Sequence, residues 1–191
     1  MTTKENAKSN VLLNFISTLR ASRIFWILSF SFLTVIGAQV AIPVNPVPFT
    51  LQTMIVLLAG ALLGPKNGAY SQIVYLAAGA VGLPVFAGGT LGFAVLIGPT
   101  GGYLLAFPLG AYLTGYLVQN YKSYAGVVLS MFAGNILIIL TGTLFLFTFY
   151  LHDFESAVIA GAAIFTIWMV VKIFVGATIY FAISKKNETL P

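Results

Sequence analysis

The stretch Pro84–Tyr103 reads PVFAGGTLGFAVLIGPTGGY and constrains how the rest of the chain can be arranged. Its six glycines and two prolines argue against a continuous helix, because proline interrupts the helical hydrogen-bond ladder and glycine favours turns. It carries no charged side chain, and the nearest basic residues are Lys66 and Lys122. Irregular apolar backbone is tolerated at membrane depth only where protein buries it or it lines a cavity. We therefore expect this glycine-rich stretch to cap or floor a binding site, with a structural re-entrant linker as the alternative.

The composition is that of an integral membrane protein. Of the 191 residues, 59% are hydrophobic and 7% are charged, with a mean hydropathy of +1.00, whereas soluble domains have about a quarter of their residues charged. A chain of this length predicts one domain and leaves no room for a separate nucleotide-binding or catalytic domain. It contains no cysteine, which excludes disulfides, thiolate chemistry and thiolate metal sites.

The apolar segments on either side of the glycine-rich stretch predict an all-α integral membrane protein. A secretory signal peptide is the competing interpretation of the basic N-terminus, but the first apolar run is longer than a usual signal core. Residues 24–184 are predicted to form the membrane domain, with 1–23 and 185–191 as cytoplasmic ends. The stretch lies between the third and fourth of six predicted spans, which are Ile24–Ile42, Leu51–Leu63, Ala69–Leu83, Tyr103–Val118, Ala125–Leu151 and Ser156–Ser184.

The basic residues support this count of spans. With six crossings both termini share one side of the membrane, and the loops that carry Lys66 and Lys122 face that side too. The opposite loops, 43–50, 84–102 and 152–155, contain no lysine or arginine. This positive-inside pattern predicts cytoplasmic termini and an outward-facing glycine-rich stretch. It also accounts for the net charge of +5 without nucleic acid as a partner.

Lys172 carries the strongest functional signal in the chain. A charge near the middle of a span is costly and is by default a functional hypothesis. No aspartate or glutamate occurs between Glu5 and Asp153, and Asp153 is roughly 25 Å away along a helix. The expected partner of Lys172 is therefore a backbone carbonyl, cavity water or an anionic group on a ligand. The alternative is a lysine satisfied by polar side chains or facing a partner protein.

Other polar residues give weaker signals. Tyr103 suits ligand contact, although anchoring at the membrane interface is the commoner use of such a tyrosine. His152 beside two carboxylates is a weak metal signal, and we predict a solvated loop and no metal site. The chain lacks the histidine pairs and the phosphate-binding glycine and lysine motif of enzymes, so we predict no enzyme and no cofactor. Neutral groups that either bond between helices or together line a polar cavity are Gln39, Gln52, Gln72, Tyr75 and Asn135.

Four further motifs read PVPFTLQ at Pro46–Gln52, AGALLG at Ala59–Gly64, YLAAGAVGLPVFAGG at Tyr75–Gly89 and GPTGGY at Gly98–Tyr103. Over Pro46–Gly115 their order and spacing resemble those of the BioY family, the biotin-specific substrate-binding (S) components of energy-coupling factor (ECF) transporters. The resemblance implies a six-helix protein that captures biotin on the outer side of a bacterial or archaeal cell membrane. It also implies a coupling transmembrane protein and two ATPase subunits as partners, and leaves a homo-oligomer open.

The resemblance also implies site residues. The family loop that matches Ala87–Thr90, and so Gly88, Gly89 and Thr90, contributes to the biotin pocket, as does the tyrosine that matches Tyr103. The last helix of the family carries Phe-x-Pro-x-Asp-x-x-Lys. Here Phe165 and Lys172 match its ends, whereas Ile167 and Met169 replace the proline and the aspartate.

The missing aspartate leads to a hypothesis about the ligand, because in the family that residue would bond the ureido ring and neutralise the lysine. Without it, the biotin carboxylate is the expected partner of Lys172. Neutral groups such as Gln52, Thr90 or Asn135 would then serve the ureido ring.

The predicted mechanism is capture from outside followed by reorientation driven by ATP hydrolysis in the partner subunits. The alternatives are an S component for another small vitamin or precursor, and a non-transporting membrane scaffold.

Overall fold

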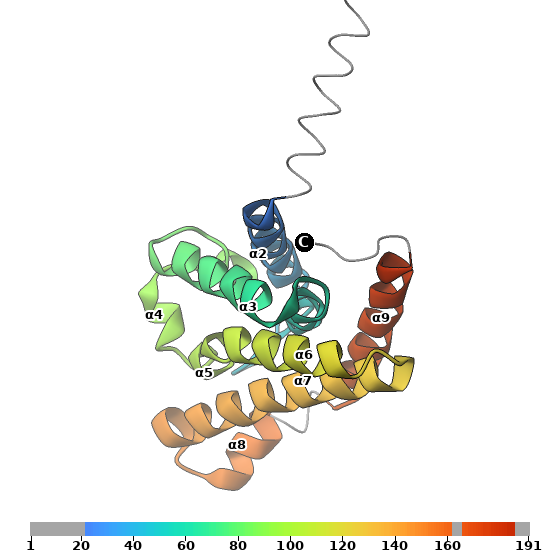
Figure 1. Ribbon diagram of the computed structural model, residues 1–191. Helices are drawn as coiled ribbons and strands as arrows, with labels where there is room; N and C mark the ends of the chain where they lie inside the picture. The colour runs from blue at the N-terminus through green and yellow to red at the C-terminus, as the bar shows by residue number, and fades with distance from the viewer. Residues whose placement is uncertain (1–21, 162–165, 186–191) are drawn as a thin grey trace, which may run out of the picture.

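The computed structural model describes residues 22–161 and 166–185, and within them the chain is almost entirely helical (Figure 1). This confirms the all-α prediction. Between α2 and α3 the described chain forms a small antiparallel hairpin of strands β1 and β2. The elements are α2 (Arg23–Gln39), β1 (Ala41–Ile42), β2 (Phe49–Thr50), α3 (Gln52–Ala80), η1 (Ala87–Gly89), α4 (Phe93–Leu96), α5 (Gly101–Leu105), α6 (Phe107–Asn120), α7 (Tyr124–Leu146), η2 (Phe147–Leu151), α8 (Phe154–Gly161) and α9 (Thr166–Ser184).

The first predicted span is too long at its C-terminal end. Helix α2 ends at Gln39, and Ala41 and Ile42 pair with Thr50 and Phe49 in the hairpin. The physical reason is Pro43, because the residue before a proline is driven from helical to extended backbone. The hairpin therefore forms one end of the bundle, next to the N-terminus of α3.

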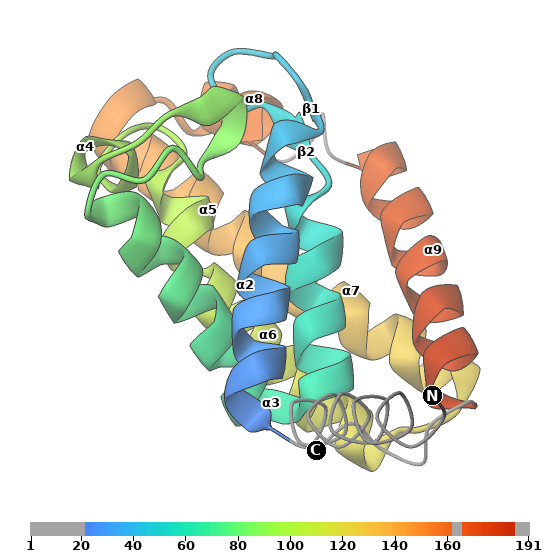
Figure 2. The same cartoon turned by 90° about the horizontal axis from the view of Figure 1, so that it is seen from above.

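Helix α3 contains the second and third predicted spans, which meet at Gly64. This glycine has φ +78° and ψ 176°, a conformation that essentially only glycine adopts. Pro65 follows as the first residue of the second half, where its missing N–H is tolerated. The predicted turn over 64–68 is thus a break at Gly64 alone, and the halves 52–63 and 65–80 diverge from it (Figure 2).

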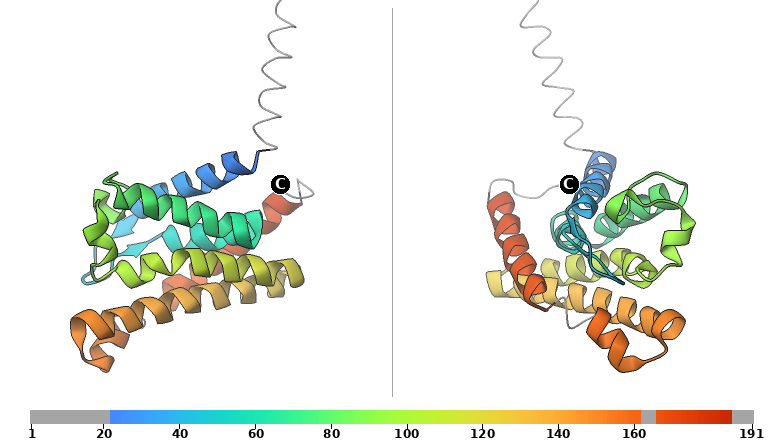
Figure 3. Two further views of the ribbon diagram at one scale, coloured as in Figure 1. Left: turned by 60° about the vertical axis from the view of Figure 1, so that its left-hand side comes forward. Right: turned by 180° about the vertical axis from the view of Figure 1, so that it is seen from behind.

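Small residues bring α3, α6 and α7 into close contact, and Figure 3 shows α6 and α7 lying side by side beneath α3. A Cβ on Gly115 would lie 2.6 Å from the carbonyl oxygen of Gly60, and one on Gly60 would collide with the backbone of Ala111. On α7, a Cβ at Gly134 would collide with the hydroxyl of Thr114. Such close approach is typical of helices that pack within a membrane.

The glycine-rich stretch is not a continuous helix, as predicted. It contains the short elements η1 and α4, and Gly88, Gly89 and Gly92 have positive φ angles. The stretch is tied back to α3, because the N–H of Gly92 donates to the carbonyl of Gly79 at 2.8 Å. The ring of Phe86 packs on the same glycine, where a Cβ would collide with it.

The predicted sixth span, 156–184, is wrong as one helix, because its described parts are two separate helices. Helix α8 packs against α7 and buries Ala157 and Gly161, while α9 packs against α3 and α7 (Figure 1). The carbonyl of Gly161, at the end of α8, accepts a hydrogen bond from Tyr103 at 3.0 Å. The fourth span also begins earlier than predicted, at Gly101, and its helix is interrupted at Ala106.

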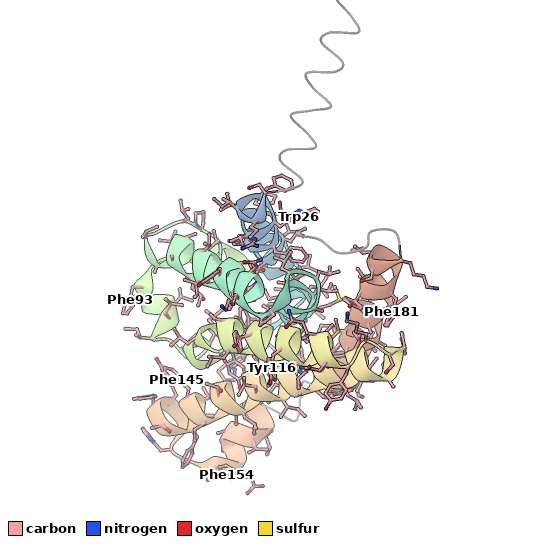
Figure 4. All side chains as sticks on the ribbon, viewed as in Figure 1. Trp26, Phe93, Tyr116, Phe145, Phe154 and Phe181 are labelled. Carbon is pink, nitrogen blue, oxygen red and sulfur yellow. The ribbon has the colours of Figure 1, made fainter. Side chains whose placement is uncertain are left out.

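The described helices include three that are long and apolar enough to cross a bilayer, Gly101–Asn120, Tyr124–Leu151 and Ile167–Ser184, together with the shorter apolar helix Arg23–Gln39. Large apolar side chains are exposed around the bundle, among them Phe93 and Phe154 (Figure 4). So many exposed large apolar side chains are unusual for a soluble protein. The molecule is an all-α membrane protein.

Candidate functional site

A cavity of about 430 Å³ lies under the glycine-rich stretch, and we call it the main cavity. The β hairpin, the start of α3, the stretch itself, the α5–α6 region and α9 all contribute to its wall. The wall is mostly apolar, with a few hydroxyl, amide and ammonium groups, a combination typical of small-molecule sites. Its lining residues are Val47, Pro48, Thr50, Gln52, Thr53, Phe86, Ala87, Thr90, Ala94, Val95, Gly98, Pro99, Thr100, Tyr103, Leu104, Phe107 and Lys172.

Lys172 is a buried cation in the wall of the main cavity, with 8% of its surface exposed. Its ammonium donates to the hydroxyl of Thr53 at 2.6 Å and to the carbonyl of Thr50 at 3.2 Å. Both partners are uncharged. The acidic residues in the described part of the chain, Asp153 and Glu155, are exposed at the start of α8. Lys172 therefore has the predicted carbonyl partner, together with a polar side chain as in the alternative, and a cavity beside it.

Tyr103 lines the main cavity, but its hydroxyl is engaged elsewhere. The hydroxyl donates to the carbonyl of Gly161 at 3.0 Å and lies 3.2 Å from the hydroxyl of Thr143. The ring packs closely on Gly142, where a Cβ would collide with it. Tyr103 thus joins the cavity wall to α7 and α8.

Gln52 and Thr90 both line the main cavity, and each already has a protein partner. The amide oxygen of Gln52 accepts from the hydroxyl of Thr50 at 3.0 Å, and its amide nitrogen donates to the hydroxyl of Tyr75 at 2.6 Å. The hydroxyl of Thr90 donates to the carbonyl of Ala87 at 3.0 Å. Thr90 is exposed at the rim, whereas Gln52 is buried.

The other predicted site residues lie outside the cavity wall. Gly88 and Gly89 form the turn of η1 between two lining residues, Ala87 and Thr90, and so shape the wall without being part of it. Asn135 is buried on α7 and does not line the main cavity. The reason is that this part of α7 faces α6 and α3, as the contacts of the preceding Gly134 indicate.

Several lining residues were not predicted from the sequence. Thr50 lies within the PVPFTLQ motif, whose order and spacing were the available signal. Thr53 and Lys172 are 119 residues apart, and no local pattern indicates that they pair. The aromatic wall formed by Phe86 and Phe107 was also missed, because apolar aromatic residues are common throughout this chain.

A smaller cavity of about 180 Å³ lies between the hairpin and α9. Thr50 and Lys172 line both cavities. The remaining lining residues are Val40, Ala41, Ile42, Phe49, Leu51 and Trp168.

The acidic loop before α8 has a structural role. Among the described residues no group of three histidine, cysteine or acidic side chains could hold a metal ion. Asp153 accepts a hydrogen bond from the backbone N–H of Ser156 at 2.8 Å and so caps the first turn of α8. The pKa of Asp153 is lowered by two hydrogen bonds from Ser156. The larger contribution comes from the Ser156 side chain and the smaller one from its backbone.

The fold and the site together define a membrane-embedded ligand-binding protein, because a helical bundle encloses a loop-covered cavity with a buried cation. Comparisons with known proteins give its family. The model of the BioY family matches residues 6–189. The biotin transporter BioY of Thermotoga maritima is 42% identical over 156 residues, covering 82% of this chain and 92% of that protein. The probable biotin transporter BioY of Pyrococcus horikoshii is 39% identical over 154 residues, covering 81% and 91%.

A solved structure agrees with these relatives. The crystal structure of the S component for biotin from an ECF-type ABC transporter matches with a TM-score of 0.81 and 25% identity, covering all of this chain and 97% of the other. The chain belongs to the BioY family and has the S-component fold, which confirms the resemblance seen in its motifs. The relatives are transporters, in agreement with the prediction that the chain is not an enzyme.

Proposed function

We propose that this protein is the substrate-binding component of an ECF transporter and that it captures biotin in the main cavity. The observation that carries the proposal is a buried ammonium group in the wall of an apolar cavity, in a chain that belongs to the BioY family. Burying an ion without a counter-charge is costly, and an acidic ligand removes that cost when it binds.

The proposed binding mode pairs the biotin carboxylate with Lys172. The fused ring and aliphatic chain of biotin then occupy the apolar part of the cavity, against Phe86, Phe107 and the ring of Tyr103. Hydroxyl groups in the wall accept hydrogen bonds from the N–H groups of the ureido ring. The Thr90 hydroxyl suits this role, because it donates to Ala87 but keeps its acceptor lone pairs. Gln52 and Asn135 are poorer candidates for this role, because the amide of Gln52 is already bonded and Asn135 lies outside the wall.

The proposed membrane arrangement has six crossings, formed by α2, the two halves of α3, α5 with α6, α7 with η2, and α9. The start of α2, the break in α3, the α6–α7 turn and the end of α9 lie at one end of the bundle (Figure 2). The described basic residues outside the cavity belong to these segments: Arg23, Lys66, Lys122 and Lys185. The hairpin, the glycine-rich stretch and α8 lie at the opposite end. By the positive-inside rule the basic end is cytoplasmic, so both termini are cytoplasmic and the main cavity faces outward.

The proposed transport step depends on partner proteins. This chain has no phosphate-binding glycine and lysine motif with which to use ATP. A coupling transmembrane protein and two ATPase subunits in the same bacterial or archaeal cell membrane would supply the energy for reorienting the loaded bundle. Residues 24–184 would act as one membrane domain, with 1–23 and 185–191 as cytoplasmic ends.

The proposal is tested by Lys172→Met, with biotin binding to the purified protein in detergent measured by calorimetry. A hydrogen bond to a charged group contributes about 1.5–3 kcal/mol, so we expect the affinity to fall roughly 10- to 100-fold. The matched control is Lys122→Met, which removes an exposed lysine in the α6–α7 turn and should leave affinity unchanged.

Three outcomes would contradict parts of the proposal. Unchanged affinity in Lys172→Met overturns the carboxylate pairing. If another vitamin binds strongly and biotin binds only weakly, the protein is an S component for that vitamin. Met169 motivates this alternative, because it replaces the aspartate of the family's last-helix motif. No saturable ligand and no co-purifying ATPase subunits would support a scaffold protein.

A further inference from the structure

We infer that Gln52 and Tyr75 are positioning residues that connect Lys172 to the glycine-rich stretch through an unbroken chain of hydrogen bonds, partly buried at Thr50 and buried at Tyr75. This inference rests on the proposed function in taking Lys172 and the stretch as parts of the binding site. It assigns Gln52 a different role from the ligand contact expected from the sequence.

The chain of hydrogen bonds begins at Lys172. Its ammonium donates to the carbonyl of Thr50 at 3.2 Å, and the hydroxyl of Thr50 donates to the amide oxygen of Gln52 at 3.0 Å. Thr50 joins the two bonds, because its backbone carbonyl accepts from the Lys172 ammonium and its hydroxyl donates to the Gln52 amide oxygen. The N–H of Gln52 also donates back to the Thr50 hydroxyl at 3.3 Å, which holds the hairpin against the start of α3.

The chain continues through α3 to the glycine-rich stretch. The amide nitrogen of Gln52 donates to the hydroxyl of Tyr75 at 2.6 Å, and that hydroxyl donates to the carbonyl of Val85 at 3.4 Å. The ring of Tyr75 lies edge-on to Phe86, with centroids 5.6 Å apart, and stacks on Phe107 at 6.4 Å. Both phenylalanines line the main cavity, whereas Tyr75 does not.

Burial makes these groups act together. Gln52 is 4% exposed, and Tyr75 is fully buried and lies outside the cavity wall, so water cannot replace a lost partner of the Tyr75 hydroxyl. A polar group left unpaired in such surroundings is costly, and linked hydrogen bonds strengthen one another. A shift of the Lys172 ammonium toward a bound acid therefore acts, through Thr50 and Gln52, on the segment that holds Phe86 against the ligand. A second bond fixes the same segment, because the amide of Gln39 donates to the carbonyl of Phe86 at 3.1 Å.

The test is Tyr75→Phe, which keeps the ring packing and removes the hydroxyl without removing a cavity-lining residue. We expect backbone hydrogen exchange over residues 84–92 to rise by about threefold or more in the ligand-free protein, because the stretch loses one of its attachments. The matched control is Tyr124→Phe, since the Tyr124 hydroxyl is on the surface, 3.4 Å from that of Thr178. Exchange over residues 84–92 in this control should equal that of the unsubstituted protein.

A second variant keeps the test decisive if Tyr75→Phe loosens the whole fold, which increased exchange in α7 would reveal. Gln52→Met removes both amide bonds and keeps a similar side-chain length. We expect it to loosen the same segment, and the double variant to add little, because both changes break one chain. Biotin affinity should fall roughly tenfold in each single variant.

Unchanged exchange over 84–92 in both single variants, or fully additive effects in the double variant, would overturn the inference. Exchange is measured without ligand, so this result does not depend on biotin being the substrate. Failure of the proposed function would appear separately: the variants would show the exchange effects, but the unsubstituted protein would not bind biotin.

Discussion

At the scale of single residues, Lys172 defines this site because it is buried without an acidic partner in the described part of the chain. Its ammonium is held by two oxygens of β2 and α3, which fix its position but leave its charge uncompensated. Met169 lies three residues earlier on the same helix, where residues i and i+3 are neighbours. The sequence analysis named a backbone carbonyl and a polar side chain among the possible partners of Lys172, but it could not say which residues supply them.

We therefore expect the single substitution Met169→Asp to change the selectivity between biotin and its methyl ester. In the unsubstituted protein we expect biotin methyl ester to bind roughly 10- to 100-fold more weakly than biotin, because the ester lacks the charge that pairs with Lys172. In Met169→Asp the new carboxylate pairs with the ammonium of Lys172, so the preference for biotin over its ester should shrink. Competition binding with both compounds measures the preference, and Met169→Gln is the uncharged control. Equal binding of ester and acid to the unsubstituted protein would refute the proposed pairing.

At the scale of elements, glycine and proline decide where the helices break. Pro65 and Gly64 divide α3, and Pro43 turns the end of α2 into a strand. These breaks were predictable in kind, because they depend on local backbone sterics. Their exact position was not, since the turn predicted over five residues is achieved by Gly64 alone.

We expect Gly64→Ala to destabilise the protein, because alanine at φ +78° and ψ 176° is strained whatever space surrounds it. The cost should be about 1–3 kcal/mol, seen as a lower thermal unfolding midpoint in detergent. Gly176→Ala is the matched control on α9, where a Cβ meets its nearest neighbour at 3.4 Å and the midpoint should stay the same or rise slightly. An unaltered midpoint in Gly64→Ala would show that the break tolerates a side chain.

At the scale of the whole molecule, the bundle has two chemically different ends. The described basic residues outside the cavity lie at one end, and the main cavity lies towards the other, under the glycine-rich stretch (Figure 2). In the proposed arrangement, this separation would connect the charge pattern of the sequence to the direction from which a ligand enters. The ATP-consuming partners would then lie at the end opposite the site.

Because the chain has no cysteine, single-cysteine labelling tests this orientation without background. In intact cells a membrane-impermeant maleimide should label Leu91→Cys, in the glycine-rich stretch, and leave Asn120→Cys, at the end of α6, unlabelled. Both side chains are exposed in the structure, so access depends on the membrane side rather than on burial. Permeabilised cells, in which both variants should react, provide the control. The reverse labelling pattern would place the termini outside.

The sequence alone determined the membrane character, the helical class, the interrupted stretch Pro84–Tyr103 and the sorting of basic residues, because hydropathy, proline and glycine act locally and their effects can be read along the chain. Only the tertiary structure decided which polar groups meet. Lys172 bonds to Thr53 from 119 residues away, Tyr103 turns its hydroxyl to Gly161, and Asn135 lies outside the main cavity. Such pairings follow from how the helices pack, and helix packing is set by many weak contacts between distant segments rather than by any local pattern.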